Sequence, residues 1–172
     1  MQIQIGTSAP AQPTPLIWLE AGLGGSMQSW NLTFPILCRA FYCARSTRST
    51  ILNPGESENV SWRSLVTEMR EGGEKTALHL GATFSNPLPV ILVGHSYGAM
   101  LVRVWAAQIL KSSTPSRIRP VGIVQIDPSF EGNNEGAGPL YQKLEQKLLT
   151  WLYQGAAREQ PSFYMAWKDL QE

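Results

Sequence analysis

The sequence predicts an α/β fold in which a mostly parallel, open sheet is flanked by helices. Short apolar runs that end in turn residues alternate along the chain with stretches of helical periodicity, and this alternation is typical of parallel sheets. The chain has 172 residues, of which 43% are hydrophobic and 16% are charged. A chain of this size and composition can build one well-packed core.

Five short segments have the length and composition of strands. Each is apolar, or alternates apolar with polar residues, and each is bounded by glycine, proline or polar residues. The segments are Gln2–Gly6, Leu16–Glu20, 40–44, 90–93 and 121–126.

Helices are expected between these strands. A short helix falls within 30–38, a longer one spans 60–80, and a third spans 99–110, where apolar side chains recur at helical spacing. The Gly72-Gly73 pair favours a break in the longer helix. Segment 45–58 is polar and rich in turn residues, which predicts a loop.

The most informative motif joins the strand at 90–93 to the helix that follows it. The connecting residues are Gly94-His95-Ser96-Tyr97-Gly98. A Gly-x-Ser-x-Gly pattern between a strand and a helix indicates a nucleophile elbow, a turn so tight that only glycine fits on either side of the serine. The turn lifts the serine hydroxyl above the sheet edge, so Ser96 is the candidate nucleophile. The alternative is a serine in a purely structural turn.

Three blocks of sequence resemble the α/β-hydrolase superfamily. Residues 19–26 (LEAGLGGS), followed by Trp30, are similar to its oxyanion loop, and 94–98 to its nucleophile elbow. Residues 121–129 are similar to the strand that follows the elbow helix. The resemblance implies the strand order 2-4-3-5-6 in the family's own numbering. It also implies a hydrolase core over 1–130 and a partial, lid-like helical region over 131–172.

The resemblance further implies roles for particular residues. The backbone N–H groups of Leu23 and Tyr97 would form the oxyanion hole. Asp127, at the end of the last expected strand, is a candidate catalytic acid, and its alternative role is to hold the local turn. An ordinary flexible turn is likewise the alternative for 22–25. The glycines that would allow close backbone approach are Gly22, Gly24, Gly25, Gly94 and Gly98.

Two departures from the family pattern bear on activity. Segment 42–47 lacks the aspartate and the glycine that many members carry after the corresponding strand. The sequence contains two histidines, His79 and His95, and neither follows Ser96. The resemblance implies that this sequence ends before the family's last two strands, which usually carry the acid and the histidine. We expect His95 to point into packing and His79 to lie at the far edge of the sheet, so neither is the expected base.

These observations predict a serine hydrolase that acts on a carboxylic ester or a related acyl bond of a small molecule. Two alternatives remain, because the triad histidine is missing from the sequence. One is a catalytically incomplete hydrolase-like protein, and the other is a small-molecule-binding protein.

Composition limits the partners. The formal net charge is +1 and the sequence has no basic block, which argues against nucleic-acid binding. We expect no metal, no cofactor and no membrane span, and a cytoplasmic location. The missing strands would leave a sheet edge unpaired, so self-association through that edge or through the lid-like helix is expected.

Overall fold

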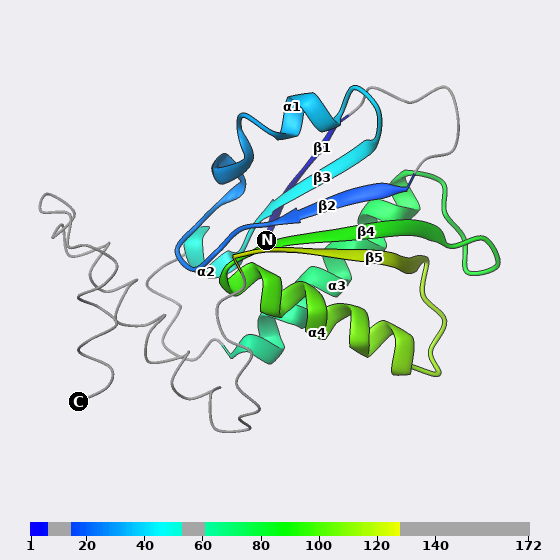
Figure 1. Cartoon of the computed structure of the whole chain (residues 1–172). Helices are drawn as coiled ribbons and strands as arrows, with labels where there is room; N and C mark the ends of the chain where they lie inside the picture. Colours follow the sequence, from blue (N-terminus) through cyan, green and yellow to red (C-terminus); the bar gives the residue numbers. More distant parts are fainter. Residues whose placement is uncertain (7–14, 53–60, 128–172) are drawn as a thin grey trace, which may run out of the picture.

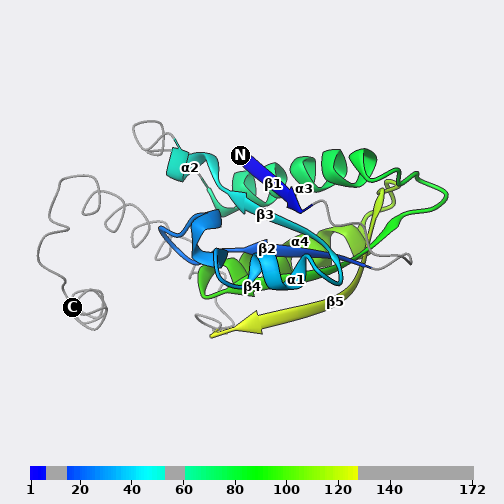
Figure 2. The ribbon, with the colours of Figure 1, turned by 90° about the horizontal axis from the view of Figure 1, so that it is seen from above.

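The computed structural model describes residues 1–6, 15–52 and 61–127, which form a five-stranded sheet with helices on both faces (Figure 1). Figure 2 shows β1 and β5 at opposite edges of the sheet. The strands lie in the order β1-β3-β2-β4-β5, and every neighbouring pair is parallel except β1 with β3. This is the expected order 2-4-3-5-6 when β1 is counted as the family's second strand, so the predicted fold class is confirmed. The bounds are β1 (Gln2–Gly6), β2 (Leu16–Glu20), β3 (Tyr42–Thr47), β4 (Leu88–His95) and β5 (Ile118–Ile126).

Two long helices, α3 (Trp62–His79) and α4 (Tyr97–Lys111), cover one face of the sheet. A 3-10 turn (Met27–Trp30) and the short helix α1 (Phe34–Leu37) cover part of the other face. A further short helix, α2 (Ser49–Leu52), follows β3. The expected short helix within 30–38 is therefore present as α1.

The larger core lies between the sheet and the α3–α4 pair. Its centre is an edge-to-face contact between Trp18 of β2 and Trp105 of α4, with ring centroids 5.2 Å apart. All five residues of β2 are buried, because helices cover the central strands on both faces. The continuous apolar run that predicted this strand therefore reflects its central position in the sheet.

The structure corrects two expectations besides the loop expected over 45–58, within which α2 (Ser49–Leu52) forms a short helix. The third strand spans Tyr42–Thr47 instead of 40–44, so the first three residues of the expected loop are strand. Their polar side chains have partners in the fold: the Ser46 hydroxyl donates to the Glu20 carboxylate, and the Thr47 hydroxyl accepts from the Met27 N–H. The second correction concerns α3, which continues unbroken through Gly72-Gly73. Both glycines are buried against neighbouring side chains, and at Gly73 the ring of Trp105 leaves no room for a larger residue.

The outer strand β5 exposes apolar side chains. Four of its apolar residues are each between 43% and 46% exposed: Val121, Ile123, Val124 and Ile126. Such a strand offers an edge to another strand. Self-association through it stays a prediction. The lid-like region expected over 131–172 lies outside the described residues.

Candidate active site

Ser96 occupies a sharp turn between the end of β4 and the start of α4. Its backbone is in the left-handed region, with φ 52° and ψ −122°, which is unfavourable for a residue with a side chain. Backbone strain of this kind costs about 1–3 kcal/mol and clusters at functional sites. The strand, turn and helix that the sequence pattern predicted are all present.

The flanking glycines are required by close backbone packing. A Cβ added at Gly94 would lie 2.5 Å from the Cα atom of Ala99, in the first turn of α4. A Cβ added at Gly98 would lie 2.4 Å from the carbonyl oxygen of Ala21, in the loop after β2. The motif spacing therefore allows α4 to start immediately after Ser96 and to pack against the glycine-rich loop.

That loop forms a tight turn beside Ser96. The Gly25 N–H donates to the Gly22 carbonyl at 3.1 Å, and Gly24 has φ 68°, as the third residue of a type II turn requires. Leu23 is the second residue of this turn. A Cβ at Gly22 would lie 3.2 Å from the Cβ atom of Ser96. The structure thus brings the candidate oxyanion loop and the candidate nucleophile together.

Tyr97 is the first residue of α4 and is buried. Backbone N–H groups in the first turn of a helix point out of its N-terminus, where the helix dipole favours negative charge. The N–H group of Tyr97 therefore belongs to the end of α4 that faces the Ser96 turn.

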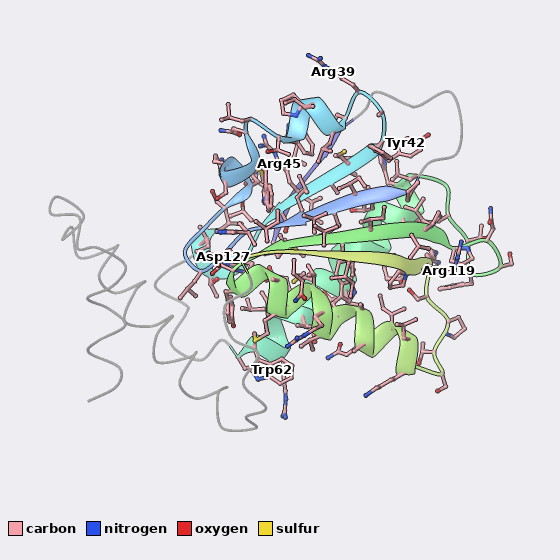
Figure 3. The ribbon with its side chains drawn as sticks, in the orientation of Figure 1. Arg39, Tyr42, Arg45, Trp62, Arg119 and Asp127 are labelled. Atoms are coloured by element: carbon pink, nitrogen blue, oxygen red, sulfur yellow. The ribbon has the colours of Figure 1, made fainter. Side chains whose placement is uncertain are left out.

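Asp127 also lies next to the elbow. The Ser96 N–H donates to the carbonyl oxygen of Ile126 at 2.9 Å, and Asp127 is the next residue in the chain after Ile126. Its side chain is exposed and its φ is 44°, which ends β5 abruptly. Figure 3 shows Asp127 where β5 ends, beside the first turn of α4.

The two histidines occupy different ends of the sheet. His95 is exposed, so the expectation that it points into packing is wrong. Its Nδ1 atom is 3.1 Å from the position of a Cβ at Gly22, which places the imidazole beside the glycine turn. His79 is the last residue of α3. The later part of that helix lies near the start of β5, because Glu74 accepts a hydrogen bond from the Arg117 N–H. Ser96 lies beside the opposite end of β5, next to Ile126. His79 is therefore remote from Ser96, as expected.

A buried ion pair that no sequence pattern predicted lies under the glycine turn. The Arg48 guanidinium donates to the Glu20 carboxylate at 2.7 Å, and both side chains are almost fully buried. Burial raises the pKa of the Glu20 carboxyl, while Arg48 and the Ser46 hydroxyl oppose that rise. The available sequence signal was a single acidic residue that ends an otherwise apolar strand.

The same guanidinium contacts the loop backbone. Arg48 Nη1 donates to the carbonyl of Ala21 at 2.8 Å, and Nη2 donates to the carbonyl of Gly22 at 2.5 Å. Its Cζ atom lies 5.8 Å from the centroid of the Tyr97 ring. Arg48 therefore links the end of β2, the glycine turn and the start of α4.

Within residues 1–6, 15–52 and 61–127, no group of three or more His, Cys, Asp or Glu side chains is placed to hold a metal ion. Among the helices of those same segments, none combines the length and apolar character needed to cross a membrane.

Solved structures with similar folds come from several bacteria. BpoC from Mycobacterium tuberculosis superposes with a TM-score of 0.55 at 19% identity, over 99% of this chain and 54% of that protein. MenH from S. aureus gives 0.54 at 12% identity, over 83% of this chain and 47% of that protein. A hydrolase from Pseudomonas aeruginosa gives 0.51 at 17% identity, over 85% of this chain and 48% of that protein.

These likenesses show an α/β-hydrolase fold. The chain spans about half the length of each of these three structures. No family model and no curated protein matches the sequence.

Proposed function

We propose that this α/β-hydrolase fold carries the nucleophile and oxyanion machinery of a serine hydrolase for carboxylic esters or related acyl bonds. The observation that carries the proposal is the left-handed backbone of Ser96, set between β4 and α4 and beside the Gly22 turn. A strained serine at the carboxyl end of a central parallel strand is the position where open α/β sheets place their reactive groups.

In the proposed reaction, the Ser96 hydroxyl attacks the carbonyl carbon of the acyl substrate. The N–H groups of Leu23 and Tyr97 donate hydrogen bonds to the carbonyl oxygen and stabilise the negative charge that develops on it. One such donor typically contributes about 2.7–4 kcal/mol to the transition state. The base that took the Ser96 proton gives it to the leaving alcohol as the C–O bond breaks, and an acyl-enzyme remains for water to hydrolyse.

The serine proton needs an acceptor, because a neutral hydroxyl is a weak nucleophile. His95 is the histidine to test first, since it is exposed, adjacent to Ser96 and beside the glycine turn. Asp127, next to the Ile126 carbonyl that binds the Ser96 N–H, is the proposed acid. Its carboxylate would stabilise the charge on a protonated base.

A second candidate function is small-molecule binding by a catalytically incomplete hydrolase-like chain. The positions of the two histidines favour it: His79 ends α3, remote from Ser96, and His95 is exposed beside the glycine turn. This alternative keeps the oxyanion turn and the elbow but forms no acyl-enzyme at a useful rate.

The test is labelling of the full chain with a fluorophosphonate, read by intact-mass spectrometry and peptide mapping. The proposal expects rapid, single-site modification at Ser96, loss of labelling in Ser96→Ala, and normal labelling in Ser29→Ala, which removes an exposed serine of the neighbouring 3-10 turn. His95→Ala and Asp127→Asn then test the base and the acid. Absence of labelling in a protein whose circular dichroism shows a folded state would contradict the hydrolase proposal and favour the binding function.

A further inference from the structure

We propose that Arg48 is a positioning residue that sets the direction of the Leu23 N–H through the carbonyl of Gly22. This inference rests on the proposed function, because it assigns Arg48 a part in forming the oxyanion hole. Arg48 itself is 0% exposed and lies beneath the turn, so it has no access to a substrate.

The link between the two residues is one rigid peptide unit. The Gly22 carbonyl and the Leu23 N–H belong to the same planar, trans peptide, so they point in opposite directions. Arg48 Nη2 donates to that carbonyl oxygen at 2.5 Å from the buried side of the turn. The Leu23 N–H is therefore directed away from the buried guanidinium. The same turn lies beside the nucleophile, since a Cβ at Gly22 would be 3.2 Å from the Cβ atom of Ser96.

The turn needs such a restraint because of its composition. Three of the four residues in 22–25 are glycine, which allows close approach to Ser96 but also leaves the backbone free to rotate. Arg48 binds two successive carbonyls, those of Ala21 and Gly22, and so fixes two neighbouring peptide planes at once. A planar, multidentate guanidinium suits this task better than an ammonium group.

Glu20 holds the guanidinium in place. One carboxylate oxygen accepts from Arg48 Nη1, and the other accepts from the Ser46 hydroxyl. Among the described residues, the buried Nε atom of Arg48 has no hydrogen-bond acceptor. Buried ion pairs with unsatisfied groups contribute little net stability compared with apolar packing. The arrangement is better explained by the geometry that it imposes on the turn.

The experiment is a double-mutant cycle read as the second-order rate of fluorophosphonate labelling at Ser96. Leu23→Pro deletes the N–H at a turn position that favours proline, and Leu23→Ala controls for the lost side chain. Leu23→Pro is expected to slow labelling by about 100-fold or more, and Arg48→Met by about 10- to 100-fold. In the Leu23→Pro background, Arg48→Met should change the rate less than about threefold, because the donor it orients is already gone.

Two further variants separate positioning from folding. Arg48→Lys keeps a positive charge beside Glu20 and is expected to fold, with labelling slowed by about tenfold because one ammonium cannot replace the planar fork. Arg45→Met removes an arginine of β3, three residues before Arg48, that binds Gln4, Asn31 and the Met27 carbonyl. It should leave labelling unchanged. An Arg48 effect of equal size with and without the Leu23 N–H would overturn the proposal.

A measurement that does not depend on the reactivity of Ser96 tests the inference separately from the proposed function. The ¹⁵N order parameter of the Leu23 amide should be near the rigid value of about 0.85 in the parent and below about 0.6 in Arg48→Met or Arg48→Lys. If the parent is not labelled at Ser96, the hydrolase proposal fails while the order parameter still decides whether Arg48 restrains the turn. An unchanged order parameter in both Arg48 variants would refute the restraint.

Discussion

Gly98 in α4 and Ala21 after β2 approach so closely that a Cβ on Gly98 would lie 2.4 Å from the Ala21 carbonyl oxygen. The same Cβ would lie 2.6 Å from the Glu20 carbonyl oxygen. Both obstacles are backbone atoms of buried residues, so neither can rotate away. Direct backbone contact between the elbow helix and the loop is therefore what brings Ser96 beside the turn that contains Leu23.

This contact predicts that Gly98→Ala destabilises the fold by about 2–3 kcal/mol, because the methyl group forces the helix and the loop apart. Gly122→Ala is the matched control, since a Cβ there meets nothing closer than 3.7 Å. Urea unfolding followed by tryptophan fluorescence measures both variants. Equal stability of the two variants would show that the loop yields without cost, and the close contact would then have no structural importance.

The adjacent glycines of α3 are expected to differ in tolerance. Alanine normally stabilises a helix by about 1 kcal/mol relative to glycine. A Cβ at Gly73 would lie 2.5 Å from the ring of Trp105, which is fully buried, whereas a Cβ at Gly72 meets the flexible ends of Met1 and Ile3.

Gly73→Ala should therefore lower the free energy of unfolding by about 1–3 kcal/mol, and Gly72→Ala should change it by less than about 1 kcal/mol in either direction. Thermal and urea denaturation of the two single variants give the comparison. The reverse ranking would contradict the packing described for α3 and α4.

Local sequence patterns predicted the parts of the fold that depend on local physics. The apolar run before Gly94 and the glycine spacing around Ser96 predicted the strand, turn and helix, because steric limits of the backbone act within a few residues. The limits of β3 were predicted poorly, because its polar second half is stabilised by side chains distant in sequence. Ser46 pairs with Glu20, which lies 26 residues earlier.

The ion pair under the turn could not be predicted for the same reason. Arg48 and Glu20 are 28 residues apart, and Arg48 stands in a polar segment that has the composition of an ordinary loop. The unbroken course of α3 also depends on long-range packing, since the side chains of Trp105 and Ile118 fill the space where a Cβ of residue 73 would lie. The catalytic roles of Ser96, Leu23, Tyr97 and Asp127 stay predictions that the labelling experiments address.

The buried Glu20 carboxyl predicts a large cost for removing its charge. Glu20→Gln leaves the Arg48 guanidinium buried without a compensating charge, which typically destabilises a protein by about 3–5 kcal/mol. Glu71→Gln is the control, because Glu71 is exposed on α3, and exposed substitutions of this kind usually change stability by less than about 0.5 kcal/mol. Urea unfolding at pH 7 measures both. A change below about 0.5 kcal/mol for Glu20→Gln would show that the carboxyl is already protonated in the folded protein.

Because the Cys43 thiol is buried, we expect the protein to lose stability in alkaline solution. Burial, with a smaller contribution from the neighbouring Cys38, raises the pKa of the Cys43 thiol from 9.0 to about 12. The folded protein therefore keeps this proton at pH values where the unfolded chain releases it. The stabilising contribution is complete below pH 9.0 and is lost as the pH rises through about 12.

The matched variant is Cys43→Ala, which lacks the titrating group. The free energy of unfolding of the parent, relative to this variant, should be constant from pH 6 to 8 and then fall, with a limiting slope of about 1.4 kcal/mol per pH unit above pH 9. Urea titrations under reducing conditions at half-unit pH steps measure the difference. A difference that stays constant up to pH 10.5 would mean that Cys43 titrates alike in the folded and unfolded chains, and that its burial does not hold the proton.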